Sequence, residues 1–213
     1  MLELLNVGDV DRLRAWSMEL FATVGFDREV IGAGRVEPPS GLESAIADGF
    51  TDALVMPPVD WQQEHRTELA AAFAGGSGWG VPYVEVGDMA PVARPESSYV
   101  LLLHPDSRTD DDLRGLTAPA LRRALGADRC LTVTEYLVVQ RAYFERHGDH
   151  RFDDYTAQQP GWMWLADSTD GARTAMAYWN GPKQRVEVTA CKTGSKNPRK
   201  GARRCRIVAL DAL

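Results

Sequence analysis

The chain has 213 residues, of which 44% are hydrophobic and 25% charged, as in ordinary globular proteins. This length buries enough surface for a core without metals or disulfides, and the densest apolar run, Tyr99–Leu103, is far shorter than the ~20 residues of a membrane-spanning helix. The net charge is −6, but residues 173–206 carry ten basic groups against one acid, so this segment is +9 and the remainder about −15.

The N-terminal part has the pattern of helices. Apolar residues recur at helical spacing over Val10–Val24, and Gly25 follows as a stop signal. Ser40 and Glu43 have the spacing of a capping box, which predicts a short helix over Gly41–Asp48. We therefore expect residues 1–49 to form a helical segment packed on a main α+β domain, residues 50–213.

The middle of the chain alternates between short strands and helices. Apolar runs and turn residues predict these elements in chain order: a strand at Ala53–Met56, a helix at Trp61–Ala74, strands at Val81–Val86 and Ser98–His104, and a helix at Ala118–Leu125. The sharpest local signal follows them. Thr132 and Glu135 form a capping box, with Leu131 and Tyr136 as its hydrophobic staple, and predict a helix that runs to about Arg146.

Beyond this helix the apolar pattern changes from helical to alternating. Short strands are expected around Trp162–Trp164, Thr174–Trp179, Val186–Ala190 and Arg206–Leu210, with a tight turn at Asn180-Gly181. The expected fold is therefore α+β: a mixed or antiparallel sheet, several short helices, and C-terminal antiparallel strands dominated by Trp and basic residues.

The order of these pieces carries a resemblance over about residues 50–206. The pieces are Tyr99–His104, Leu116–Gly126, Leu131–Glu135, Ala175–Trp179, Gly181-Pro182-Lys183 and Gly194 with Asn197-Pro198. In this order the chain resembles a family of uncharacterised actinobacterial proteins, a domain of unknown function. The resemblance implies a cytoplasmic protein of an actinobacterium or its phage, and no catalytic residue. One departure is that family members carry aromatic residues where this chain has Lys196, Arg199 and Lys200.

The strongest departure from average composition is the basic segment Lys192–Arg206, which has seven cations and no acid. Gly194, Asn197, Pro198 and Gly201 favour an irregular, flexible loop. Such a loop suits an anionic partner, and we expect a protein partner rather than a nucleic acid, with self-association as a further option. Neutralisation by the chain's own acids is the competing explanation. The candidate binding residues are Lys192, Lys196, Arg199, Lys200, Arg203, Arg204 and Arg206.

The tryptophans support an alternative function. Trp162, Trp164 and Trp179 are a candidate stacking platform for a planar ligand, although such residues also build cores. With the acidic region Asp149–Asp154 they would frame the pocket of a small-molecule enzyme. The leading hypothesis is nevertheless a non-enzymatic binding or assembly protein.

The remaining chemistry is sparse. Cys130, Cys191 and Cys205 form no CxxC pair, so reduced thiols in a cytoplasmic protein are expected. Cations near Cys191 and Cys205 would lower a thiol pKa, but buried structural cysteines are the preferred interpretation. The His147–Asp154 region has both histidine and carboxylate, yet a polar helix end explains it as well. We expect no metal and no cofactor.

Overall fold

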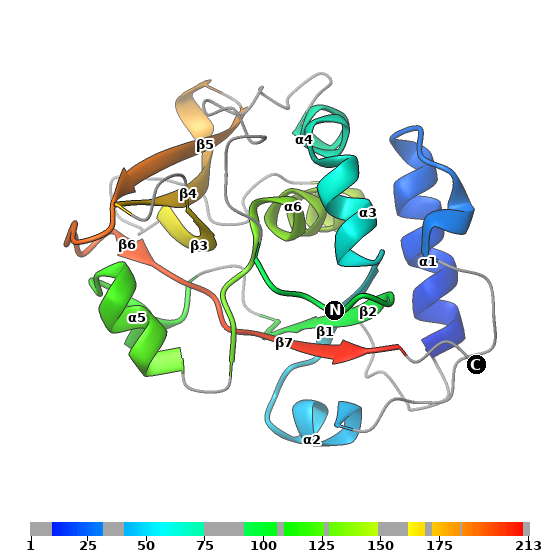
Figure 1. Ribbon diagram of the computed structural model, residues 1–213, viewed down its shortest axis with the longest axis horizontal. Helices are drawn as coiled ribbons and strands as arrows, with labels where there is room; N and C mark the ends of the chain where they lie inside the picture. The colour runs from blue at the N-terminus through cyan, green and yellow to red at the C-terminus, as the bar shows by residue number, and fades with distance from the viewer. Residues whose placement is uncertain are drawn as a thin grey trace. The chain divides into compact units, whose positions relative to one another are not determined.

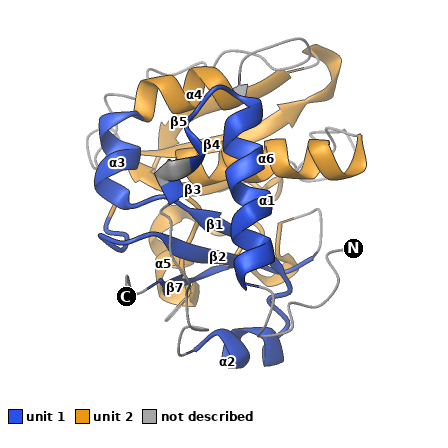
Figure 2. Ribbon diagram, turned by 90° about the vertical axis from the view of Figure 1, so that its right-hand side faces the viewer, with its two compact units in different colours: residues 1–65, 93–105, 205–213 blue, residues 66–92, 106–204 orange. Residues whose placement is uncertain are grey.

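The computed structural model describes residues 10–31, 41–74, 92–105, 109–125, 128–148, 162–168, 172–183 and 185–210. The chain divides into two compact units (Figure 2). Unit 1 comprises residues 1–65, 93–105 and 205–213, and unit 2 comprises residues 66–92 and 106–204. Each unit contains helices and one sheet, so the expected α+β class is confirmed. The boundary expected after residue 49 falls inside unit 1.

Unit 1 is built on a three-stranded antiparallel sheet. Its strands are β1 (Asp52–Met56), β2 (Tyr99–Leu103) and β7 (Cys205–Ala209), in the order β1-β2-β7 (Figure 1). Every residue of the central strand β2 is buried. Because β2 is covered on both faces, its sequence is a continuous apolar run rather than an alternating one.

One helix of unit 1 provides a hydrogen-bond acceptor for an edge strand of this sheet. The helices of the unit are α1 (Val10–Thr23), α2 (Leu42–Ala47), α3 (Val59–Glu64) and the 3₁₀ helix η2 (Arg28–Ile31). The Ser17 hydroxyl of α1 donates to the Leu13 carbonyl at 2.9 Å and accepts from the Val55 backbone N–H at 2.9 Å. Because β1 is an edge strand, its free N–H needs such a partner, and α1 is thereby joined to β1.

Unit 2 contains a four-stranded mixed sheet in the order β5-β4-β3-β6. Its strands are β3 (Trp162–Ser168), β4 (Arg173–Asn180), β5 (Arg185–Lys192) and β6 (Lys200–Gly201). β3, β4 and β5 pair antiparallel, whereas β6 pairs parallel with β3. The chain therefore leaves β5 at one edge of the sheet and returns at the opposite edge.

The longest helix of unit 2 begins where the sequence predicts. The helices are α4 (Arg66–Ala74), α5 (Ala118–Leu125), α6 (Val133–His147), and the 3₁₀ helices η4 (Asp111–Leu113) and η5 (Gly181–Lys183). At the start of α6 the Thr132 hydroxyl accepts from the Glu135 N–H at 3.1 Å, and the Glu135 carboxylate accepts from the Thr132 N–H at 2.7 Å. This reciprocal pair confirms the capping box. Gly148, in the left-handed conformation, ends the helix.

Some elements differ from the sequence expectation. The single helix expected over Trp61–Ala74 is two helices. The first, α3, ends at Glu64; His65 caps it with non-helical backbone angles and stacks its ring on Trp61, with 4.4 Å between the ring centres. The last strand joins β2 in unit 1 and not the tryptophan strands, since pairing partners are set by tertiary contacts. The strand expected at Val81–Val86 and the cap at Ser40 lie outside the described residues.

Gly201 provides a test of how tightly β6 is seated. A Cβ at this position would lie 2.7 Å from both Cβ and Oγ1 of Thr109, so alanine would force the strand and the neighbouring loop apart. We expect Gly201→Ala to lower the free energy of unfolding by about 1–3 kcal/mol, measured by chemical denaturation. Gly194→Ala is the control, since its Cβ would meet nothing within 4 Å. An equal effect of both substitutions would contradict the close approach at Gly201.

Candidate functional site

The segment between β5 and β6 is irregular but held in place. The Ser195 N–H donates to the Lys192 carbonyl at 2.8 Å, and the Lys200 N–H donates to the Asn197 carbonyl at 3.0 Å. The Thr193 N–H donates to the Ala172 carbonyl at 2.9 Å, and the Thr193 carbonyl accepts from the first residue of α5. This network fixes the segment against β4 and α5, although its glycines and proline predict a flexible loop.

Three of the seven candidate cations are exposed. The side chains of Lys192, at the end of β5, and of Lys196 and Arg199, on the β5–β6 connection, are exposed. Lys192 and Lys196 make no ion pair within the described part of the chain. Lys192 stands directly opposite Arg173 of β4, which is also exposed. Like charges directly opposite on neighbouring strands destabilise a sheet. We call Arg173, Lys192, Lys196 and Arg199 the cationic rim.

Arg204 has its counter-charges inside unit 2. Its guanidinium lies 2.5 Å from Asp112, 3.5 Å from Asp110 and 3.6 Å from Asp128. The hydrogen bond with Asp112 raises the pKa of the guanidinium, and the neighbouring carboxylate charges add to this effect. Asp110 also accepts a hydrogen bond from the Arg204 backbone N–H at 2.7 Å. These carboxylates neutralise Arg204 and fix its geometry.

Arg206 belongs to unit 1 and is also neutralised. Its guanidinium lies 2.5 Å from the Asp48 carboxylate and 4.7 Å from the centre of the Phe50 ring. The ion pair and the cation–π contact hold the side chain within unit 1. For Arg204 and Arg206, neutralisation by the chain's own acids, the competing explanation raised from the sequence, therefore describes the structure.

Lys200 and Arg203 are buried. Arg203 has no exposed surface, and Lys200 is 2% exposed. Lys200 Nζ lies 3.0 Å from Cys191 Sγ, 2.7 Å from Ser195 Oγ and 4.8 Å from the centre of the Trp164 ring. Neither cation is accessible to a macromolecular partner in this conformation. The seven candidate residues are therefore not brought together into one surface.

The neighbouring Lys200 changes the chemistry of Cys191. Partial burial would by itself raise the pKa of this thiol, but hydrogen bonds from Lys200 and Ser195 and the charge of Lys200 lower it below its ordinary value. Cys191 is partly exposed, whereas Cys130 and Cys205 are buried, and all three are free thiols. Low pKa combined with solvent access is the setting of a reactive thiolate.

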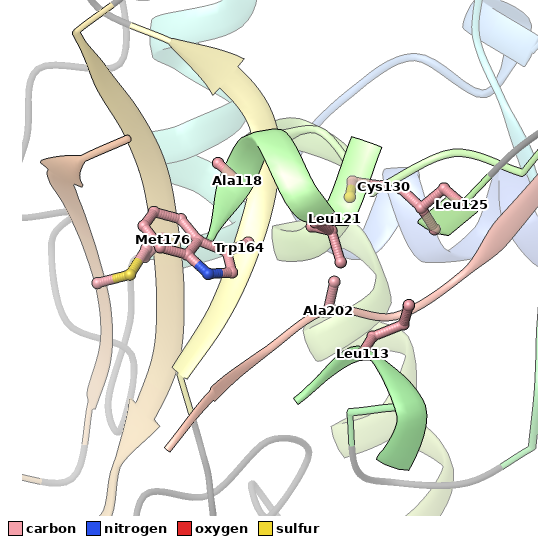
Figure 3. Close-up of a cluster of buried hydrophobic side chains, with 8 residues drawn as sticks. All are labelled: Leu113, Ala118, Leu121, Leu125, Cys130, Trp164, Met176 and Ala202. Atoms are coloured by element: carbon pink, nitrogen blue, oxygen red, sulfur yellow. The ribbon is translucent and has the colours of Figure 1, made fainter. Parts of the chain in front are cut away.

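The tryptophans do not share one face of the sheet. Trp164 is directly opposite Met176, so the two side chains lie on the same face, whereas Trp179 lies three positions further along β4 and faces the other way. Trp164 has no exposed surface and Trp179 has 3%. Figure 3 shows Trp164 and Met176 in a cluster with Leu121 of α5. Trp164 and Trp179 are thus core residues, and the side chain of Trp162 lies outside the described ones.

Glu187 forms ion pairs with two further basic residues. Its carboxylate accepts hydrogen bonds from Lys183 Nζ at 3.0 Å and from Arg185 at 2.8 Å, and the Tyr178 hydroxyl also donates to it. Partial burial alone would raise the pKa of the Glu187 carboxyl, but these donors outweigh it and lower that pKa to about 2. Lys183 and Arg185 therefore share the single negative charge of Glu187, at the end of β4 and β5 away from the rim.

Of the His147–Asp154 region, His147 and Gly148 lie among the described residues and the rest lies outside them. His147 is exposed at the C-terminal end of α6. Its ring packs on the ring of Tyr143, with 4.4 Å between the ring centres. Across the residues that the structure describes, no three His, Cys, Asp or Glu side chains are grouped to hold a metal ion. Nor is any helix there long and apolar enough to cross a membrane.

Sequence reasoning finds the parts of the thiol cluster but not the cluster itself. The sequence marks Cys191 by its cationic surroundings, places Lys200 on the expected partner surface, and gives Ser195 no role toward the thiol. The spacing from Cys191 to Ser195 and Lys200 matches no common motif. The one available signal is a cysteine followed within ten residues by cations, which does not show which side chain turns inward.

Comparison with protein-family models, curated proteins and solved structures found no match in any of the three. The resemblance to an actinobacterial family therefore remains a prediction.

The Glu187 cluster gives a pH-dependent test. Because the pKa of Glu187 is lowered from 4.5 to about 2, its stabilising contribution is complete above about pH 4.5 and is lost as the pH falls toward 2. We expect Glu187→Gln to cost about 1–2 kcal/mol of unfolding free energy at pH 7, and the difference from wild type to shrink below pH 4.5. Chemical denaturation across this pH range measures it.

Glu145→Gln is the matched control, because Glu145 pairs with Arg141 on the surface of α6. Its cost should stay within about 0.5 kcal/mol. A Glu187→Gln cost that does not change with pH would contradict the lowered pKa.

Proposed function

We propose that this is a non-enzymatic binding or assembly protein that docks an acidic protein surface on the cationic rim. The observation that carries the proposal is that some cations of the basic segment are exposed and others are not. Lys192 and Lys196 remain exposed with no ion pair within the described part of the chain, whereas Lys200, Arg204 and other cations of the segment are buried or neutralised. A cluster of exposed like charges steers an oppositely charged partner and favours its binding.

The backbone network of the β5–β6 connection supports the same proposal. Backbone hydrogen bonds from Thr193, Ser195 and Lys200 hold the connection that carries the rim residues in a fixed conformation. A preorganised surface loses less conformational entropy on association than a flexible loop. The four rim residues therefore offer a defined set of binding groups and not a diffuse attraction.

The charge distribution favours a protein partner over a nucleic acid. Proteins that bind duplex DNA often make about 6–10 phosphate contacts. The rim has four cations, on a chain of net charge −6. Outside residues 173–206 the chain carries about −15, so a second copy also offers acidic surface. Three free cysteines support a reducing compartment, and we propose that the protein acts in the cytoplasm.

One observation favours the alternative of a small-molecule enzyme near the tryptophan strands. The ammonium of Lys200 contacts both the Cys191 thiol, at 3.0 Å, and the Trp164 ring, at 4.8 Å from its centre. A buried amine beside a thiol is a reactive pair in many enzymes.

Charge reversal tests the docking proposal. The variant Lys192→Glu/Lys196→Glu/Arg199→Glu should bind immobilised poly-L-glutamate about 20-fold to 150-fold more weakly than wild type, because each of the three cations removed takes away about 0.6–1 kcal/mol of attraction. Biolayer interferometry at low salt measures this, and the wild-type affinity should fall as salt is raised. Thermal melting followed by circular dichroism checks that the variant is folded.

The control Arg12→Glu/Arg122→Glu/Arg123→Glu reverses the same number of exposed cations elsewhere on the chain. It should stay within about threefold of wild type, because its charge change is equal but lies off the rim. Equal weakening of both variants would overturn the proposal. Tighter binding of a duplex oligonucleotide than of poly-L-glutamate would replace the protein partner with a nucleic acid. Sedimentation velocity of wild type and rim variant reports whether a second copy is the partner.

A further inference from the structure

The surroundings of Cys191 are those of a reactive site and not only of a packed thiol. Cys191 is the second-last residue of β5 and stands opposite Thr174 of β4. It is partly exposed, and of the three cysteines, all of which the structure describes, it alone is not buried. Cys191 is therefore the cysteine most open to small solutes.

Lys200 supplies a positive charge at the sulfur. The residue is only 2% exposed, and its Nζ lies 3.0 Å from Cys191 Sγ. Moving an ammonium out of water is costly unless an acceptor or counter-charge compensates for it, and a thiolate supplies both. Conversely, the ammonium stabilises the thiolate, which is the nucleophilic form of cysteine. Lys200 therefore favours the charged form of the Cys191 thiol.

Ser195 completes the arrangement. Its Oγ lies 2.7 Å from Lys200 Nζ, and after Lys200 it is the second side chain that lowers the pKa of the Cys191 thiol. The backbone positions both residues, because the Ser195 N–H donates to the Lys192 carbonyl and the Lys200 carbonyl accepts from the Gly115 N–H at 2.7 Å. The ammonium of Lys200 and the hydroxyl of Ser195 are thus preorganised beside the thiol of a partly exposed cysteine.

We propose that Cys191 is a nucleophilic thiolate that hydroperoxides oxidise reversibly to a sulfenic acid. The thiolate sulfur attacks one peroxide oxygen, the S–O bond forms and the O–O bond breaks. The sulfur loses two electrons and the peroxide gains them. The oxygen that leaves takes a proton from Lys200, which recovers it from solvent, so a hydroperoxide ROOH yields the alcohol ROH, and hydrogen peroxide yields water.

The chemistry of the site favours a small peroxide. Cys191 is only partly exposed, which suits a reagent as small as hydrogen peroxide, and the leaving hydroxide is stabilised by a donor already 3.0 Å from the sulfur. A small-molecule thiol returns the site to its starting state: it displaces water from the sulfenic acid to form a mixed disulfide, which a second thiol reduces. This reaction is independent of docking at the rim.

The experiment uses the full chain and hydrogen peroxide itself. Native protein is treated with peroxide, the sulfenic acid is trapped with dimedone, and peptide mass spectrometry locates the adduct. We expect the adduct on Cys191, with Cys130 and Cys205 as internal references in the same sample. A second measurement follows alkylation of each cysteine by iodoacetamide against pH, and the Cys191 midpoint should lie below that of the unfolded protein.

Variants separate reactivity from simple packing. Lys200→Met should slow the peroxide reaction of Cys191 about tenfold at pH 7 and raise its alkylation midpoint, since it removes one charge-assisted hydrogen bond. Lys200→Arg, which keeps the charge, should restore part of the rate. Ser195→Ala, in the partly buried connection, removes one hydroxyl and leaves Lys200 in place, so it should raise the alkylation midpoint of Cys191 by less than Lys200→Met does. This variant keeps the test valid if Lys200→Met does not fold.

Two results would overturn the proposal. One is the absence of a dimedone adduct on Cys191 under conditions that oxidise a free small-molecule thiol. The other is an alkylation midpoint of Cys191 equal to that of the unfolded chain and unchanged in Ser195→Ala.

Discussion

The buried ammonium of Lys200 is the constraint on which the C-terminal part of unit 2 depends. Removed from water, this charge needs acceptors, and it finds them in Cys191, Ser195 and the Trp164 ring. These partners come from β5, the connection that follows it, and β3. Satisfying one charge therefore requires that the connection fold back over the sheet and that β6 lie beside β3. The pairing of β6 with β3 and the close approach of Gly201 to Thr109 are consistent with this requirement.

The cations of the basic segment Lys192–Arg206 lie in different environments. Arg204 is neutralised by three carboxylates of unit 2, Arg206 by Asp48 in unit 1, and Lys200 lies beneath the surface next to a thiol. The exposed remainder is the cationic rim. A count of charges along the sequence treats these residues as equal, but their availability to a partner differs. The proposed binding and the proposed thiol chemistry thus draw on neighbouring residues of β5 and the connection that follows it, with different side chains serving each.

Local signals predict local structure because their cause is local. The capping box of α6 depends on two residues three positions apart, and both hydrogen bonds form as expected. The tryptophan platform instead depends on which face of the sheet each side chain occupies. Trp164 and Trp179 lie on different strands, so their relative facing follows from the register between β3 and β4. That register is set by packing and cannot be read from either strand alone.

Sequence alone was sufficient for the α+β class, for the helix starts and strand runs that follow from periodicity, and for the concentration of basic charge near the C-terminus. These properties depend on residues near one another in the chain. Tertiary structure was needed to join the last strand to β2, to break the helix at His65, and to turn Lys200 inward while Lys192 and Lys196 stay exposed. Lysine carries the same charge at each position, and only the groups around it decide whether that charge is solvated, neutralised by a carboxylate or set against a thiol.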